Sequence, residues 1–158
     1  MGQRRKAREC ALQILYELEF HPDELEAVLA DYWARQKVTP EVKEYGDWLV
    51  RGVFGRLSFL DAAIQAVSEH WRLPRMTVID RNLLRLAVFE LETEPYLEPA
   101  IIINEAVEIA KKYSGEEAAH FVNGILDALR KRREAKSKAP KNSSPAKKKP
   151  GGGEKENG

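Results

Sequence analysis

Four basic side chains lie close together at the start of the chain, and one aromatic residue follows them at helical spacing. The basic residues are Arg4, Arg5, Lys6 and Arg8. Arginine can hold a phosphate through two parallel hydrogen bonds, and an exposed tyrosine can stack on an unpaired base. In a helix, Arg5, Arg8 and Tyr16 fall on one flank, beside the apolar stripe and not within it. The pattern predicts an RNA-binding strip, and the alternative is an ordinary solvated helix end.

The sequence lacks a pattern typical of catalysis or metal binding. His21, His70 and His120 are far apart, and Cys10 is the only cysteine. Metal sites need several such ligands at short spacing, and a nucleophile needs a base beside it. No glycine-rich phosphate-binding loop is present. We therefore expect no enzymatic activity, no metal and no cofactor.

The cellular compartment can be predicted from three further features. A lone cysteine cannot form a disulfide within the chain, which is typical of a reducing environment. No apolar run has the length of a membrane helix, and the first eight residues are charged rather than apolar. These features predict a cytoplasmic protein.

The net charge of +1 hides two parts of opposite sign. From Glu134 onward there are seven lysines against three glutamates, so residues 134–158 carry +4 and residues 1–133 carry −3. An acidic body does not bind nucleic acid at random, so a local basic patch must supply the phosphate contacts. The acidic remainder is left for a basic partner.

Apolar residues recur at three- and four-residue steps along most of the chain, which is typical of amphipathic α-helices. No apolar alternation is long enough to predict a strand. The fourth helix is expected to extend far enough for Trp71 to face inward, and residues 78–94 are apolar on almost every face. The breaks predict seven helices, beginning near Gln3, Asp23, Thr39, Ser58, Val78, Pro99 and Gly115.

The predicted organisation is one helical domain followed by a tail. Residues 1–133 form the domain, with two lobes at about 1–57 and 58–133. Residues 134–158 contain Lys, Pro, Gly, Ser and Asn with almost nothing apolar. Such a segment cannot offset its ordering entropy, so we expect it to be disordered.

Four blocks of the sequence, in order, resemble the NusB family of transcription antitermination factors. They are residues 5–16 (RKARECALQILY), 81–91 (RNLLRLAVFEL), 103–111 (INEAVEIAK) and 120–127 (HFVNGILD). The resemblance spans roughly residues 4–130. It implies an all-α fold of two packed helical lobes.

The resemblance also implies a function. Members of this family bind the boxA element of ribosomal RNA leaders together with a small-subunit ribosomal protein acting as NusE. The complex is loaded onto RNA polymerase and suppresses termination during ribosomal RNA synthesis.

Site residues follow from the resemblance by position. In the partner-facing region Asp80 matches an acidic position, and Leu84 lies on the same side of the predicted helix. At position 120 the family usually has a lysine, so His120 is a departure. The residues implied to face RNA are Arg4, Arg5, Lys6, Arg8, Gln13, Tyr16, His120 and Phe121.

Two other functions remain open. The chain could be an RNA-binding module that assists an RNA-modifying enzyme, because a lobe of this kind precedes some ribosomal RNA methyltransferase domains. It could also be a helical protein–protein scaffold with no role in RNA binding. For Asn104 and Glu105, near the start of a helix, we prefer a structural role in holding backbone amides or a loop.

Overall fold

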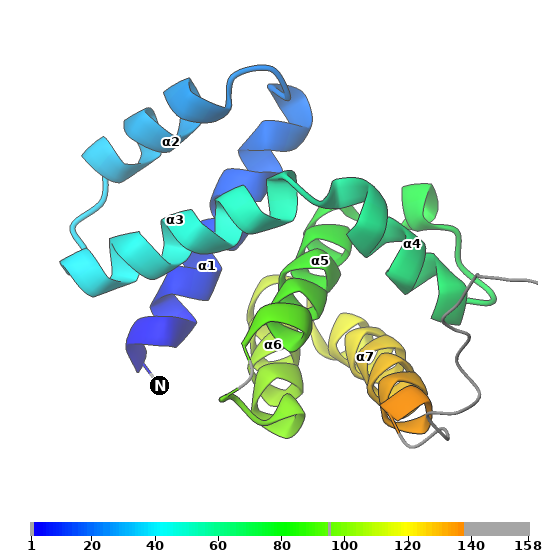
Figure 1. The fold of residues 1–158 in the computed structure, drawn as a ribbon. Coiled ribbons are helices and arrows are strands. Elements are labelled where there is room, and N and C mark those ends of the chain that lie inside the picture. The colour runs from blue at the N-terminus through cyan, green and yellow to red at the C-terminus, as the bar shows by residue number, and fades with distance from the viewer. Residues whose placement is uncertain (1, 95, 138–158) are drawn as a thin grey trace, which may run out of the picture.

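The computed structural model describes residues 2–94 and 96–137, and all regular structure within these ranges is helical. This confirms the predicted all-α fold with seven α-helices in the described part of the chain. The helices are α1 (Gly2–Phe20), α2 (Leu25–Ala34), α3 (Pro40–Phe54), α4 (Leu57–Val67), α5 (Val78–Thr93), α6 (Pro99–Tyr113) and α7 (Glu116–Ser137), with one 3₁₀ turn at Leu73–Arg75 (Figure 1).

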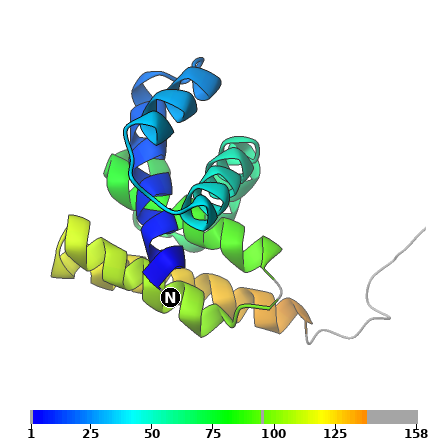
Figure 2. The ribbon, with the colours of Figure 1, turned by 90° about the vertical axis from the view of Figure 1, so that its left-hand side faces the viewer.

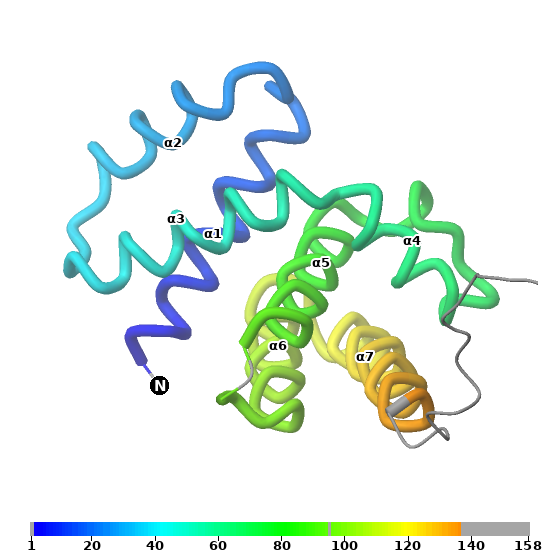
Figure 3. Tube along the Cα trace, in the orientation of Figure 1, coloured from blue at the N-terminus to red at the C-terminus, as the bar shows by residue number. Residues whose placement is uncertain are grey.

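The helices are arranged in two groups around α5. Helices α1, α2 and α3 lie on one side, and α4, α6 and α7 lie on the other (Figures 1 and 3). Helix α5 packs against α1, α3, α4, α6 and α7. The turned view shows the amino-terminal part of α1 in front of α6 (Figure 2), and Arg5 and Arg8 of α1 donate hydrogen bonds to Glu105 of α6. Helix α4 begins at Leu57, beside the predicted lobe boundary, although the division into two lobes remains a prediction.

The apolar patterns of α1 and α5 decide where the core lies. Helix α5 is buried from residue 82 to residue 91 without a break, as expected for a central helix. The predicted stripe of α1 is at most 3 % exposed at every position: Ala7, Ala11, Ile14, Leu15 and Leu18. These two helices therefore form the frame on which the surface residues are placed.

Local sequence signals set several helix ends. The hydroxyl of Thr39 accepts a hydrogen bond from the Val42 amide at 3.3 Å, and Thr77 accepts one from the Asp80 amide at 3.1 Å. Both are N-cap contacts that satisfy amides left free in the first turn. Gly115 separates α6 from α7 with a φ of 106°, a left-handed conformation that suits glycine.

Trp71 does not face inward as predicted, because α4 ends at Val67. The Ser68 hydroxyl donates a hydrogen bond to the Trp71 carbonyl at 2.6 Å, and the Gln65 amide donates to the same oxygen at 3.1 Å. These side chains fold the chain into a turn instead of a further helical turn. The Trp71 side chain is 48 % exposed.

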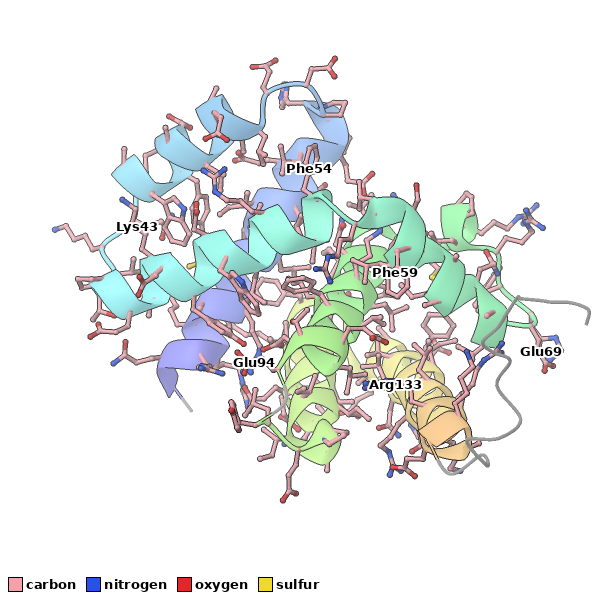
Figure 4. All side chains as sticks on the ribbon, in the orientation of Figure 1. Lys43, Phe54, Phe59, Glu69, Glu94 and Arg133 are labelled. Atoms are coloured by element: carbon pink, nitrogen blue, oxygen red, sulfur yellow. The ribbon has the colours of Figure 1, made fainter. Side chains whose placement is uncertain are left out.

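The carboxyl-terminal helix is longer than predicted. Helix α7 extends to Ser137, so residues 134–137, which we expected to be disordered, are helical. Near its end Arg133 donates a hydrogen bond to the Leu91 carbonyl at 2.8 Å, which attaches α7 to the end of α5 (Figure 4). The rest of the predicted tail, residues 138–158, lies outside the described residues.

Two negative findings apply to residues 2–94 and 96–137. No helix there has both the length and the apolar character to cross a membrane. No group of three or more His, Cys, Asp or Glu side chains is placed to hold a metal ion.

Candidate nucleic-acid interface

The residues predicted to face RNA lie on two elements, α1 and the start of α7. On α1, Arg4, Lys6, Gln13 and Tyr16 are exposed, Arg5 is partly exposed and Arg8 is buried. Helix geometry predicted a shared flank for Arg5, Arg8 and Tyr16, and the family resemblance implied the other residues. Contacts with the other helices leave some of these α1 side chains exposed and bury others.

Arg8 is a correction to the predicted RNA surface. It donates two hydrogen bonds to Glu90 of α5, at 2.8 and 2.9 Å, and one to Glu105 of α6 at 3.2 Å. Burial by itself lowers the pKa of Arg8, but the hydrogen bonds and charge of Glu90 outweigh burial and raise that pKa. With its side chain 5 % exposed, Arg8 joins three helices and is not available to RNA.

Arg5 lies at the edge of the same cluster. It donates two hydrogen bonds to Glu105, at 2.6 and 2.8 Å, while 36 % of its side chain stays exposed. The hydrogen bonds from Arg5 lower the pKa of the Glu105 carboxyl, so that group is ionised at neutral pH. Arg5 can therefore reach RNA, but with its charge already largely balanced.

Glu105 has the structural role that we preferred, with different partners. We expected it to hold backbone amides or a loop, and it instead pairs with Arg5 and Arg8 across the interface between α6 and α1. Asn104 is exposed.

The basic groups that remain directed outward are Arg4 and Lys6. The Arg4 guanidinium lies 4.2 Å from the ring centroid of Tyr45 and 3.6 Å from the carboxylate of Glu94, which Figure 4 labels at the end of α5. Its side chain is nevertheless 44 % exposed. Lys6, two residues further along the helix, is also exposed.

Further along α1 the surface is aromatic and uncharged rather than basic. Tyr16 is 44 % exposed and its ring lies 5.4 Å from that of Phe20 on the following turn. Gln13 donates a hydrogen bond to the Tyr113 hydroxyl at 3.1 Å and accepts one from the Tyr32 hydroxyl at 2.5 Å. Side chains that can stack and hydrogen-bond without charge are suited to nucleobases.

The contacts between α1 and α6 bring the start of α7 to this surface. Lys112 pairs with Glu9 at 3.0 Å, and Tyr113 holds Gln13. Since α7 begins three residues after Tyr113, its first turns follow directly from this joint. His120 is exposed there and Phe121 is partly buried.

A groove between α1, α2 and the end of α6 was not predicted from the sequence. It has a volume of about 360 Å³, and its walls include Tyr16, Tyr32 and Tyr113 together with Gln13 and Arg35. Tyr32 stands beside Trp33 in α2, among apolar residues whose pattern is typical of core packing. Its hydroxyl has a polar partner 19 residues away, and no local pattern indicates that pairing.

The predicted partner residues are less accessible than expected. Leu84 is 0 % exposed, so the prediction that it contacts a partner is wrong, because α5 is covered on the side that carries it. Asp80 is 9 % exposed, in the first turn of α5. Its Oδ1 atom is buried without a hydrogen-bond partner among the described residues.

Comparison with other proteins identifies the family. A sequence profile of the NusB family matches residues 5–131. The transcription antitermination protein NusB of Sorangium cellulosum is 43 % identical over 129 residues, covering 82 % of this chain and 92 % of that protein. The protein of the same name from Bdellovibrio bacteriovorus is 46 % identical over 130 residues, covering 81 % of this chain and 95 % of that protein.

Solved structures agree with the sequence relatives. NusB of T. maritima superposes with a TM-score of 0.73 at 39 % identity, covering 88 % of this chain and 94 % of that one. A chain in the crystal structure of antitermination factors NusB and NusE in complex with dsRNA gives a TM-score of 0.75 at 28 % identity, covering 84 % and 98 % of the two chains. Because sequence and fold both match over most of the chain, the protein belongs to the NusB family.

Proposed function

We propose that this protein is a transcription antitermination factor that binds RNA together with NusE. It binds boxA-type leader RNA with a small-subunit ribosomal protein acting as NusE, joins the antitermination complex on RNA polymerase, and promotes read-through during ribosomal RNA synthesis. It acts in the cytoplasm and catalyses no reaction. The support is the family membership, with relatives named for antitermination and a similar chain solved with NusE and dsRNA.

One observation carries the RNA-binding part of this proposal. Exposed basic, amide and aromatic side chains occur along α1, and the hydrogen bond from Gln13 to Tyr113 joins this helix to the end of α6, three residues before α7 begins, which supports one surface shared by α1 and the start of α7. After the correction of Arg8, the proposed RNA-binding residues are Arg4, Arg5, Lys6, Gln13, Tyr16, His120 and Phe121. Arg4, Arg5 and Lys6 supply phosphate contacts, and the later residues supply stacking and hydrogen bonds.

The partner contact is proposed at the start of α5. Asp80 is an acidic residue in the first turn of α5 that keeps 9 % of its surface exposed, and a donor from a basic protein could bind its carboxylate there. Asp80 is the proposed acceptor. Replacing it by lysine should weaken binding of the ribosomal protein while RNA binding by the isolated chain stays close to that of the wild type.

The function is tested by titrating a boxA-type leader RNA and a scrambled RNA of equal length, each with and without the ribosomal protein. We expect tighter binding of the boxA-type RNA, an increase on adding the protein, and a modest decline with salt because few phosphates are contacted. Equal affinity for both RNAs with no effect of the protein would contradict the proposal.

A further inference from the structure

A chain of hydrogen bonds runs beneath the exposed face of α1 and passes through the amide of Gln13. The Tyr32 hydroxyl donates to Gln13 Oε1 at 2.5 Å, and Gln13 Nε2 donates to the Tyr113 hydroxyl at 3.1 Å. The Tyr113 hydroxyl donates in turn to Glu9 Oε1 at 3.2 Å, and Lys112 Nζ donates to the same oxygen at 3.0 Å. Helices α1, α2 and α6 each contribute to this chain.

The carboxylate at one end fixes the direction of every bond. The Tyr113 hydroxyl donates its one proton to the Glu9 carboxylate oxygen, so the Tyr113 oxygen is left to accept from Gln13. The amide nitrogen of Gln13 must therefore face Tyr113, and its oxygen must face Tyr32. Burial raises the pKa of both tyrosines, so each hydroxyl keeps the proton that this arrangement requires.

The amide is fixed in direction yet remains exposed. A glutamine amide has two N–H groups and two acceptor positions, and Gln13 uses one of each within the protein. One N–H and one lone pair are left on an exposed residue at the edge of the groove. An adjacent donor and acceptor of known order can recognise the edge of a base, and a side-chain amide matches adenine through N6 and N7.

We infer that Tyr32 and Tyr113 are positioning residues that hold the Gln13 amide in one orientation, so that Gln13 reads the edge of an unpaired base, preferentially adenine, seated in this groove. This inference rests on the proposed RNA-binding function. Tyr16 borders the groove and stacks on the base, while Gln13 sets which base is accepted.

The charges around the groove favour a base over a phosphate as the occupant. The one cationic side chain among its lining residues, Arg35, is already paired with Asp31 at 3.0 Å and lies 3.6 Å from Glu17. A phosphate would have to compete with both carboxylates. Phosphate contacts belong instead to Arg4 and Lys6, earlier on α1, while the uncharged amides and tyrosines of the groove face the base.

The test compares two probes, an oligouridylate and the same oligonucleotide with one central adenosine. For the wild-type chain we expect the adenosine probe to bind about tenfold more tightly. Tyr113→Phe and Tyr32→Phe should each reduce this ratio by about threefold to tenfold, because each loses one hydrogen bond that orients the amide. Tyr96→Phe, at a residue 94 % exposed and outside the groove, is the matched control and should leave the ratio unchanged.

A double-mutant cycle separates positioning from a general structural effect. Gln13→Met removes the amide, so adding Tyr113→Phe to it should change the ratio no further. A further drop in the double variant would mean that Tyr113 acts independently of Gln13 and would overturn the inference. Thermal melting of each variant confirms that the fold is intact.

The remaining outcomes also decide the question. If the wild type binds both probes equally, or if Tyr113→Phe keeps the full adenosine preference, the inference fails while RNA binding stands. If Gln13→Met weakens the ribosomal protein and leaves both RNA affinities unchanged, the groove is a protein contact and the inference is overturned. If neither RNA binds, with or without the ribosomal protein, the proposed function itself fails.

Discussion

The two halves of α1 carry residues predicted for the same surface, but their surroundings are opposite. In the first half, carboxylates of α5 and α6 pair with Arg5 and Arg8. In the second half, Gln13 meets only tyrosine hydroxyls and Tyr16 is open to solvent. Burial and ion pairing within the fold therefore limit how far an arginine can contribute to RNA binding: Arg8 is removed from the surface, and Arg5 is left partly exposed.

The two halves of α1 therefore have different roles. The first half mainly holds the fold together and offers a small number of free cations. The second half offers groups that distinguish bases. The predictions below test this division, beginning with the largest expected effect.

Replacing Arg8 by alanine should destabilise the protein by about 3–5 kcal/mol, because Glu90 would stay buried without its cationic partner. Urea unfolding measures the loss. Arg4→Ala is the control, and it should cost less than about 1 kcal/mol because that pair is exposed. If the Arg8→Ala variant is as stable as the wild type but binds RNA more weakly, Arg8 contacts RNA after all.

Glu105→Gln should lower the unfolding free energy at neutral pH by about 2 kcal/mol, through loss of charged hydrogen bonds. The folded pKa of Glu105 lies below its ordinary value of 4.5. Its stabilising effect is therefore present above pH 4.5 and disappears as the pH falls through the folded pKa.

Unfolding of wild type and Glu105→Gln over a pH series should show a stability gap that narrows in acid. Glu108→Gln, at a partly exposed residue of the same helix, should show a small gap at every pH. A wild-type advantage that persists unchanged in acid would mean that the charge of Glu105 does not stabilise the fold.

Tyr16→Ala should weaken RNA binding about tenfold, the value expected for one lost stacking contact, with little change in stability. Fluorescence anisotropy with labelled RNA measures the affinity. Phe59→Ala is a matched control on α4, since Phe59 is 55 % exposed and carries no predicted contact (Figure 4). Equal losses in both variants would show that exposed aromatic residues act without a specific site.

Arg4→Ala and Lys6→Ala should have the smallest effect. Each should reduce the slope of log affinity against log salt by about one unit or less, since each removes one phosphate contact. Lys43→Ala, an exposed lysine on α3, should leave the slope unchanged (Figure 4). A slope unchanged in all three variants would contradict a phosphate-binding role for the start of α1.

Sequence periodicity predicted the helices well because each apolar stripe is repeated over several turns. The burial of α5 on all sides and the stripe of α1 are examples. Periodicity could not predict that Arg8 and Leu84 are buried. A helical pattern shows which residues share one face, but not which carboxylates or helices the rest of the chain brings to that face.

The errors at the helix ends have a related cause. Residues 134–137 contain no apolar anchor, yet they continue a helix that Arg133 attaches to the Leu91 carbonyl. Trp71 lies outside α4 because Ser68 and Gln65 bind backbone carbonyls in the turn. In both places the difference from the prediction goes with side-chain hydrogen bonds to backbone carbonyls, which composition does not reveal.

The pairing of Arg8 with Glu90 and Glu105 also constrains the order of events on the ribosome. These partners are separated by 82 and 97 residues, so α1 is synthesised long before the carboxylates that complete it. At ordinary elongation rates the delay is on the order of ten seconds. Until Glu90 and Glu105 have been synthesised, Arg8 lacks the carboxylates that hold it in the folded protein.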